Sequence, residues 1–599
     1  MGRVRLLLGY EKGVDRMFRV FRSVRIFVVA TFITTGVSAQ DVLYVDATAS
    51  SGGDGLAWQS AFDDLADALA ATETMPDVSE IWVAAGVYLP GEPDETEATF
   101  QLRQGLAIYG GFAGDEDDLD QRDPAINVTV LSGDLGQDDE YGDPVWHVGW
   151  NRHTANSAHV VTGSGCDATA VLDGFTIEAG ATGANGTPAG APQMYGSGLY
   201  NVNGSPTIRH CTFKRNLAAF AHGGAVYNMD SSPTFEHCEF IQNWVHLGHG
   251  GAIANRGNSA VTVTDSTFVE NRSVGSSPAA AGGGIAHQSD GPLVIERCKF
   301  IGNISENFFP TGGDYGGYGG GVYHFSGGLT VASSTFEDNW SNAGGGLFTW
   351  NNATIINSVF NGNEAPEYST SFGGWGGFGG AIGGSSFAGM TVAVANSTIV
   401  NNTAHEGGGL RVVNNADADV ANSIFWHNSD GNGMIGPSQI RGGGASYSCI
   451  ENMLVGEAGE DPPDPEKFPN CIDGDPLFID LADGDVALSA GSPCIDAADN
   501  TALPIEIESD IAGDLRFVDD PDTADTGFGQ PPIVDIGAYE HQVQPEVPGD
   551  VTGDGVVNVS DLLMLLGAWG PCAPACDGDL NGDGMIGVED LLTLLANWG

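Results

Sequence analysis

A short pattern, Cys or Ser-x-Phe-x-x-Asn, recurs eight times between Gly196 and Asn428 and constrains this chain more than any other feature. The copies begin at Cys211, Cys238, Ser266, Cys298, Ser334, Ser358, Ser397 and Ser423, with Ile399 in place of Phe in the seventh. Their aromatic or aliphatic positions are 27, 28, 32, 36, 24, 39 and 26 residues apart. A period of this length predicts stacked structural repeats.

The repeats have the composition of β-structure. Val, Ile, Phe and Thr dominate the apolar runs, Gly-rich corners separate them, and no 3.6-residue apolar stripe is present. We therefore expect a parallel β-helix, with about three short strands in each coil and equivalent residues about 4.8 Å apart in successive coils. This spacing predicts a buried ring stack of Phe213, Phe240, Phe268, Phe300, Phe336 and Phe360 and a ladder of Asn amides.

Cysteines occupy one column of the repeat. Cys211, Cys238 and Cys298 are expected to pack in the core as free thiols, which behave as small apolar groups. Cys572 and Cys576 are close enough in sequence to form a disulfide, whereas Cys449, Cys471 and Cys494 leave one thiol unpaired whatever the pairing.

The first 39 residues have the character of a secretory signal peptide. Seven basic residues precede or flank the apolar run from Ile26 to Val37, and Val37-Ser-Ala39 ends it like a cleavage site. The run is shorter than the ~18–20 residues that a membrane span needs, and either Met1 or Met17 can be the start. We expect a secreted, extracellular or cell-surface protein without a membrane span.

The composition excludes nucleic acid as a partner. The chain has 599 residues, 78 acidic and 21 basic side chains, and a formal charge of −57. Phosphate binding requires basic patches that so few cations cannot build, whereas the acidity suits calcium or high-salt surroundings.

The segments flanking the repeats predict caps and irregular coils. An opening Leu43-Tyr-Val-Asp-Ala is followed by a helix expected over Trp58–Ala71, which can cover the open end of a solenoid. The expected organisation is signal peptide 1–39, N-terminal cap and irregular coils 40–160, repeats 161–444, C-terminal coils and cap 445–542, linker 543–549 and a C-terminal module 550–599.

These features together carry a family resemblance. The Gly-rich coils with Cys-Thr-Phe-x-x-Asn, the piece Ser492-Pro-Cys-Ile-Asp496 and the closing Val534-Asp-Ile-Gly-Ala-Tyr-Glu540 resemble secreted right-handed parallel β-helix proteins of the pectin-lyase-like superfamily, over roughly residues 41–542. That superfamily contains polysaccharide lyases, glycoside hydrolases and non-catalytic surface proteins, so the resemblance leaves the activity open.

The C-terminal module contains two copies of a twelve-residue calcium loop. Oxygen ligands stand at positions 1, 3, 5, 9 and 12, glycine at 6 and a backbone carbonyl at 7, although Gly587 breaks the second loop at position 9. The predicted ligands of two Ca²⁺ ions are Asp550, Thr552, Asp554, Val556, Asn558 and Asp561, then Asp579, Asn581, Asp583, Met585 and Asp590. We expect calcium to fold this module and to leave the β-helix unaffected.

A helix follows each loop but does not precede it, and position 12 is Asp, so the module resembles a dockerin (type I) rather than a full EF-hand. The resemblance implies docking onto a cohesin-like or other cell-surface partner. The pairs before position 12 are Val559-Ser560 and Val588-Glu589, where dockerins commonly carry Ser or Thr, so this sequence departs from the pattern.

The sequence assigns no catalytic residue. Cations are few and isolated in the repeats, no twin Asp pair occurs there, and His222 and His249 fit corner residues better than a hydrolase motif. Two long connections between coils are instead rich in aromatic side chains, which can stack on a sugar chain or fold down as a lid: Phe308, Phe309, Tyr315 and Tyr318, and Tyr368, Phe372, Trp375 and Phe378.

Two functional hypotheses follow. The chain is a secreted calcium-binding β-helix protein that binds or degrades extracellular polysaccharide, tethered by its dockerin-like module; if it is an enzyme, it is a glycoside hydrolase or polysaccharide lyase acting on O-glycosyl linkages. The alternative is a non-catalytic adhesin or cell-surface structural protein. Paired carboxylates facing one groove favour an enzyme, and an aromatic-only groove favours an adhesin.

Overall fold

The structure is a computed structural model, which describes residues 41–598 except 140–154, 184–190, 221, 276–279, 308–316, 367–376, 432, 457–462, 504–506, 543–547, 553–555, 573–575 and 577. The expected signal peptide and most of the expected linker lie outside the described residues.

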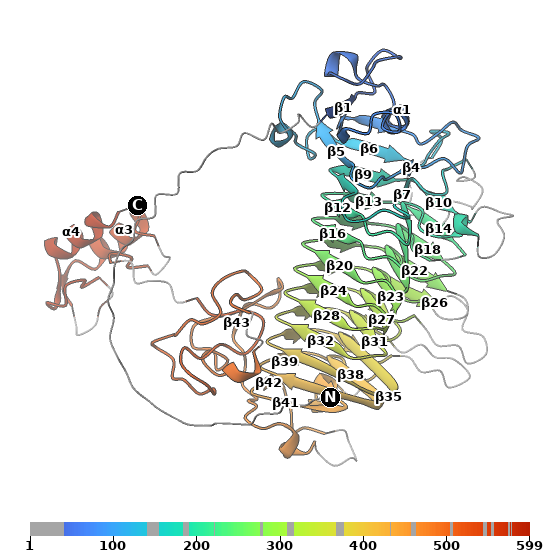
Figure 1. Ribbon diagram of the computed structural model, residues 1–599. Coiled ribbons are helices and arrows are strands. Elements are labelled where there is room, and N and C mark those ends of the chain that lie inside the picture. Colours follow the sequence, from blue (N-terminus) through green and yellow to red (C-terminus); the bar gives the residue numbers. More distant parts are fainter. Residues whose placement is uncertain are drawn as a thin grey trace, which may run out of the picture. The chain divides into compact units, whose positions relative to one another are not determined.

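Parallel strands stacked coil upon coil make up the body of the protein (Figure 1). A typical coil contains four strands, β11 (Leu199–Val202), β12 (Thr207–Arg209), β13 (Thr212–Lys214) and β14 (Leu217–Ala219), rather than the expected three. His210 and Arg215 adopt positive φ values of 44° and 55° and turn the chain sharply at single residues. These two turns separate β12, β13 and β14, which the sequence alone suggests to be one continuous segment.

The strands form three long sheets. The 12-stranded sheet contains β3 (Gly86–Tyr88), β6 (Thr129–Ser132), β9 (Phe175–Glu178), β13, β17 (Glu239–Ile241), β21 (Thr267–Val269), β25 (Lys299–Ile301), β29 (Thr335–Glu337), β33 (Val359–Asn361), β36 (Thr398–Val400), β39 (Ile424–Trp426) and β42 (Cys449–Ile450). The eight-stranded sheet contains β10 (Ala181–Thr182), β14, β18 (Trp244–His246), β22 (Arg272–Gly275), β26 (Ile304–Asn307), β30 (Trp340–Ser341), β34 (Glu364–Ala365) and β37 (Thr403–Ala404).

The remaining sheet has 22 strands and covers two sides of the coil, which the long strands β35 and β38 join. It contains β1 (Asp41–Val45), β2 (Val78–Ala84), β4 (Phe100–Gln101), β5 (Ala107–Phe112), β7 (Val161–Thr162), β8 (Val171–Asp173), β11, β12, β15 (Val226–Met229), β16 (Thr234–Glu236), β19 (Ile253–Gly257), β20 (Val261–Thr264), β23 (Ile285–Ser289), β24 (Leu293–Glu296), β27 (Val322–Ser326), β28 (Leu329–Ala332), β31 (Leu347–Thr349), β32 (Ala353–Ile356), β35 (Ile382–Ala395), β38 (Leu410–Ala421), β40 (Ile440–Arg441) and β41 (Gly443–Ser446).

The predicted ring stack forms the centre of the core. All six phenylalanines are fully buried, and adjacent rings are parallel with centroids 4.5–5.1 Å apart. Their strands pair in register, as Phe213 with Phe240 and Phe240 with Phe268. Cys211, Cys238 and Cys298 are buried free thiols. The predictions of an internal Phe column and of Cys core packing are confirmed.

A ladder of asparagine amides runs beside the ring stack. Each Nδ2 donates to the Oδ1 of the Asn in the next coil at 2.9–3.0 Å, from Asn216 to Asn428, and Gln439 receives the last of these bonds at 2.8 Å. The predicted ladder is confirmed. A second ladder, through Asn201, Asn228 and Asn255, lies in another column and was not predicted.

The N-terminal helix is shorter than predicted. The helix α1 (Leu65–Ala71) begins after Asp64, whose side chain accepts a hydrogen bond from the Ala66 N–H, while Trp58–Ser60 forms a 3₁₀ turn. Asp64 stops the helix from extending backward because it caps the free N–H groups at that point. The buried face of α1 joins the hydrophobic core of the first coil, as expected of an end cap.

The C-terminal cap follows the last coil and has its own core. It contains the antiparallel pair β43 (Phe478–Asp480) and β44 (Asp485–Leu488), the short helix α2 (Gly436–Gln439) precedes it, and 3₁₀ turns occur at Pro465–Lys467 and Asn500–Ala502. The cap packs on the solenoid through bonds such as Ala538 N–H to Thr398 Oγ1 at 3.0 Å.

The C-terminal module has two helices, α3 (Val559–Gly567) and α4 (Val588–Ala596), and a short antiparallel pair, β45 (Gly570–Pro571) and β46 (Met585–Ile586). Its core consists of Val551, Val557, Leu565, Ile586 and Leu594. A disulfide joins Cys572 and Cys576. Within the described part of the chain, no helix has the length and apolar character that crossing a membrane requires.

Candidate functional site

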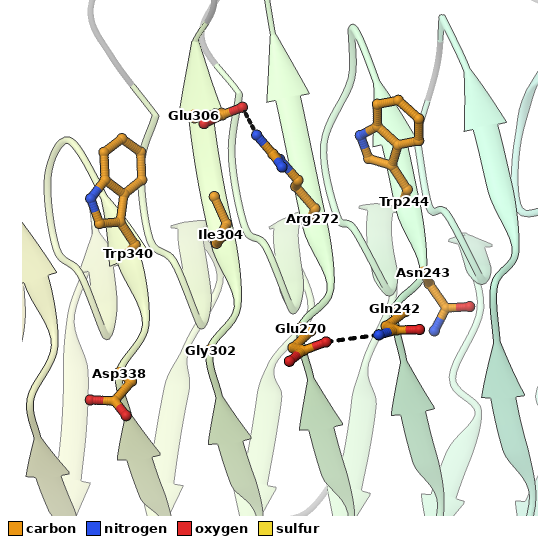
Figure 2. Close-up of a pocket in the computed structure, with 10 residues that line it drawn as sticks. All are labelled: Gln242, Asn243, Trp244, Glu270, Arg272, Gly302, Ile304, Glu306, Asp338 and Trp340. Atoms are coloured by element: carbon orange, nitrogen blue, oxygen red, sulfur yellow. Dashed lines mark hydrogen bonds and ion pairs between the residues drawn. The ribbon is translucent and has the colours of Figure 1, made fainter. Parts of the chain in front are cut away.

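An open groove of about 560 Å³ lies on the outer face of the eight-stranded sheet (Figure 2). Its floor is one column of the sheet, in which Trp244, Arg272, Ile304 and Trp340 are register partners on β18, β22, β26 and β30. Adjacent coils lie about 4.8 Å apart, so the backbones that carry Trp244 and Trp340 are separated by about 14 Å. Figure 2 shows a Trp at each end of the groove, with Arg272 and Ile304 between them.

The turn that precedes these strands supplies the polar edge of the groove. Gln242, Glu270, Gly302 and Asp338 occupy the same position in four successive coils, immediately before the Asn of the ladder. All four have positive φ, between 52° and 62°, and the Asn ladder fixes the backbone that follows them. Glu270 and Asp338 are exposed, and Glu270 accepts a hydrogen bond of 2.8 Å from Gln242.

Gly302 leaves a gap between the two exposed carboxylates. A Cβ at this position would meet only the Glu270 side chain, at 3.7 Å, so the space above Gly302 is open. Glu270 and Asp338 are two coils apart, which separates their backbones by about 10 Å. This arrangement is a pair of carboxylates across a gap in a groove with aromatic ends.

The electrostatic balance of the groove is negative. Glu270, Glu306 and Asp338 contribute three carboxylates, and Arg272 forms an ion pair with Glu306 across the floor. Burial lowers the pKa of Arg272, and the charge of Glu306 and the hydrogen bond to it oppose this shift. The Glu306 partner therefore compensates the cation, and the net charge comes from Glu270 and Asp338.

Sequence reasoning missed these residues because the column they share does not repeat one residue type. Trp244, Arg272, Ile304 and Trp340 each follow the ladder Asn directly, and Gln242, Glu270 and Asp338 each precede it. A search for adjacent acidic residues cannot find carboxylates that the coils bring together from positions 68 residues apart, 270 and 338. Aligning the repeats on the ladder Asn would have shown that these residues occupy equivalent positions in adjacent coils.

A second polar pocket, of about 650 Å³, lies near β8, where the chain turns from β12 of the 22-stranded sheet into β13 of the 12-stranded sheet. The Asp173 carboxylate accepts from Arg122 Nη2 at 2.7 Å and lies 3.0 Å from His210 Nδ1, while Arg122 also donates to the Gly110 carbonyl and lies over the Tyr109 ring. These contacts hold the segment around Arg122 against the sheet, so we assign them a structural role.

His222 and His249, predicted to be corner residues, stack with ring centroids 4.9 Å apart at a corner of successive coils. Burial and the nearby Arg256 charge lower the pKa of His222 to about 2 and that of His249 to about 3. Both rings are therefore neutral at physiological pH.

The predicted carbohydrate-binding loops lie mostly beyond the described residues. Phe308, Phe309, Tyr315, Tyr368, Phe372 and Trp375 belong to undescribed segments. Phe378 is buried and Tyr318 half-buried, and both pack against Phe348, at ring-centroid distances of 5.8 and 4.7 Å. For these two rings the packing matches the lid alternative, and the binding role of the loops stays a prediction.

The two predicted calcium loops share a pair of backbone hydrogen bonds to the Asp at position 12. Asp561, at position 12 of the first loop, accepts from the N–H groups of Thr552 and Asn558. Asp590 accepts likewise from Asn581 and Gly587, which occupy the same positions of the second loop. Asp550, Val556, Asp579, Asp583 and Met585 lie in these loops, whereas Asp554 lies outside the described residues. The donor set consists of oxygen atoms alone, which fits a hard cation such as calcium.

Comparison with known proteins supports the fold. Residues 167–336 match the sequence model of the right-handed β-helix region. No curated protein matches the sequence.

Among solved structures, a pectate lyase (Pel9A) is 14% identical, with a TM-score of 0.38, covering 85% of this chain and 98% of its own. The catalytic unit of an α-1,3-glucanase from Streptomyces thermodiastaticus is 11% identical, with a TM-score of 0.27 and coverages of 70% and 71%. The Streptococcus pneumoniae surface protein and adhesin PfbA is 11% identical, with a TM-score of 0.25 and coverages of 68% and 91%. The chain thus folds as a right-handed parallel β-helix, and likenesses this distant carry no argument about its activity.

Proposed function

We propose that this protein is secreted and binds an extracellular polysaccharide in the groove between Trp244 and Trp340. The pair of indole rings at the two ends of one open groove is the observation that carries the proposal. Indole faces stack on the apolar faces of sugar rings, and the side chains of Gln242, Glu270 and Asp338 line the same groove with hydrogen-bonding groups for hydroxyls.

The groove favours a neutral polysaccharide over an acidic one. Its three carboxylates outnumber the single Arg272, and the whole chain carries a formal charge of −57. A polyuronate would bring further negative charge into this surface, and like charges at these distances repel.

Hydrolysis of the bound chain is a second function, which the Glu270–Asp338 pair favours. An inverting glycosidase uses two carboxyl groups about 6.5–9.5 Å apart, and the backbones that carry Glu270 and Asp338 are about 10 Å apart, just beyond this range. In this reaction one carboxylic acid protonates the glycosidic oxygen. The other carboxylate takes a proton from a water in the gap above Gly302, and that water attacks the anomeric carbon.

The test compares binding and cleavage on neutral and acidic polysaccharides. Trp244→Ala/Trp340→Ala is expected to weaken retention on a neutral polysaccharide at least tenfold, whereas Phe325→Ala, which removes an exposed ring outside the groove, leaves it unchanged. Equal retention of the double variant and wild type would refute the proposal.

Cleavage is scored in the same experiment as new reducing ends. Glu270→Gln/Asp338→Asn is expected to abolish them while the protein still binds the polymer. Retention without reducing ends in the wild type leaves the groove as a binding site and supports the adhesin alternative instead.

The C-terminal module is proposed to bind two Ca²⁺ ions and to tether the protein through a cohesin-like or other cell-surface partner. Its oxygen-only donor set and the matched backbone bonds to Asp561 and Asp590 support the calcium part. Pull-down of the calcium-loaded chain by immobilised cohesins tests the tether, and absence of capture at any calcium concentration would remove it.

A further inference from the structure

Three carboxylates converge in the C-terminal cap, which precedes the predicted calcium loops in the sequence. One oxygen each from Asp496, Asp519 and Asp525 lies within 4.8 Å of the other two. Two oxygens bound to one calcium at 2.3–2.6 Å can be at most about 5 Å apart, so a single ion can reach all three.

Asp496 lies at the bottom of this cluster with an unsatisfied oxygen. The residue has no exposed surface, and its Oδ1 atom has no hydrogen-bond partner among the described residues. Its Oδ2 accepts from the Asp520 N–H at 3.3 Å, and its own N–H donates to Asp535 at 2.8 Å. A buried acceptor without a partner is unfavourable, and a cation at this point would satisfy it.

No basic side chain neutralises the cluster. Among the residues that the structure describes, none of the three carboxylates forms an ion pair, and the buried Arg516 lies beside Glu540 instead. The site concentrates negative charge without a protein counter-charge.

The backbone holds the two segments of the cluster together. The carbonyl of Asp496 accepts from the N–H groups of Thr526 and Gly527, at 2.9 and 3.1 Å. Asp519 and Asp525, at the two ends of the segment 519–525, are exposed to solvent. An ion therefore has a path from solvent to the buried Asp496.

From this geometry we propose that Asp496, Asp519 and Asp525 form a calcium site, which ties the loop 519–527 to the segment 494–498 of the cap. Three carboxylates and no nitrogen or sulfur donor select a hard divalent cation. The two exposed carboxylates leave positions for water, which suits the six to eight ligands of calcium better than the strict octahedron of magnesium. This proposal differs from the prediction made from the sequence, in which calcium leaves the β-helix unaffected, and the experiments below distinguish the two.

The test counts bound calcium on the full mature chain by equilibrium dialysis at pH 7.5. Asp519→Asn/Asp525→Asn changes exposed residues only and is expected to bind one ion fewer per chain than wild type. Asp522→Asn, an exposed acid in the same loop outside the cluster, is the matched control and is expected to bind the wild-type number. The count refers to a difference, so it holds whether or not the C-terminal module binds ions.

Thermal unfolding gives the second measurement. In a chain whose C-terminal loops carry Asp550→Ala and Asp579→Ala, millimolar calcium is expected to raise the unfolding temperature, while the same concentration of magnesium raises it less. Adding Asp519→Asn/Asp525→Asn removes the calcium effect. An unchanged ion count in the Asp519/Asp525 variant, or an equal loss in Asp522→Asn, would overturn the proposal.

Discussion

Phe268 lies in the middle of the ring stack, fully buried between Phe240 and Phe300 at centroid distances of 4.6 Å on both sides. Phe268→Ala is expected to lower the free energy of unfolding by about 3–5 kcal/mol, because the coils above and below hold the cavity open. Urea unfolding followed by tryptophan fluorescence measures the loss. Phe325→Ala, which removes a ring that is 50% exposed, is the control, and similar losses for both variants would contradict the packing role of the stack.

Two buried histidines are predicted to make stability depend on pH. Burial lowers the pKa of His287 to about 4 and, together with the neighbouring His287, that of His324 to about 3. In the unfolded chain both rings titrate near 6.5, so between pH 6.5 and about 4 the unfolded state takes up protons that the folded state does not. The stability that the neutral rings provide above pH 6.5 is therefore lost as the pH falls, by about 1.4 kcal/mol per histidine and pH unit.

The measurement compares unfolding free energies at pH 5 and pH 7.5 for wild type and His287→Gln/His324→Gln. The variant is expected to lose less stability on acidification, and contributions from the carboxylates cancel in the comparison. The Asn255 Nδ2 atom lies 3.3 Å from His287 Nδ1, so Asn255→Ser removes a contact of His287 without removing a titrating group. This variant serves as the control and is expected to keep the wild-type slope. Identical slopes for wild type and the histidine variant would rule the prediction out.

At the scale of elements, the C-terminal module is predicted to need calcium to fold. Asp579, Asp583 and Asp590 crowd one small loop, and the cluster of Val551, Val557, Leu565, Ile586 and Leu594 is too small a core to offset their repulsion. Calcium removes the repulsion and binds the folded loop better than the unfolded one. Residues 543–599 should thus gain helical circular dichroism on titration with calcium.

Asp550→Ala and Asp579→Ala are each expected to remove one ion from this module, with the larger loss of stability for Asp550→Ala because its loop has the fuller ligand set. A spectrum that is the same in chelator and in millimolar calcium would refute the folding prediction.

The elements also show where sequence reasoning reaches its limit. Strand content and the Phe and Asn columns could be predicted because one residue type recurs at one position in every coil. The division of each coil into four strands could not, because residues such as His210, Arg215 and Asp265 adopt positive φ without a glycine to signal it. The start of α1 was misplaced because Asp64 acts as a cap in the middle of a continuous apolar pattern.

For the whole molecule, the fold was predictable and the groove was not. The ring stack and the amide ladder each consist of one residue type at the same position of every coil, and the sequence shows this recurrence as a repeat. Trp244 and Trp340 are far apart in the sequence, and only the stacking of the coils, three steps from one to the other, places them at the two ends of one groove. The prediction of the binding loops, by contrast, rests on their aromatic composition alone. Tyr318 and Phe378, the two of these rings that the structure describes, pack onto the solenoid.

The position before each ladder asparagine differs from coil to coil: Arg215, Gln242, Glu270, Gly302, Asp338, Gly362, Asn401 and His427. The residue beside it, the asparagine, is fixed in every coil by hydrogen bonds along the stack. The residue that holds the coils together and the residue that faces the groove are thus adjacent in the sequence. A substitution at this position leaves the hydrogen-bonded asparagine in place and affects only neighbouring side chains, such as Asp338 beside Gly362, so a new specificity can arise by single substitutions.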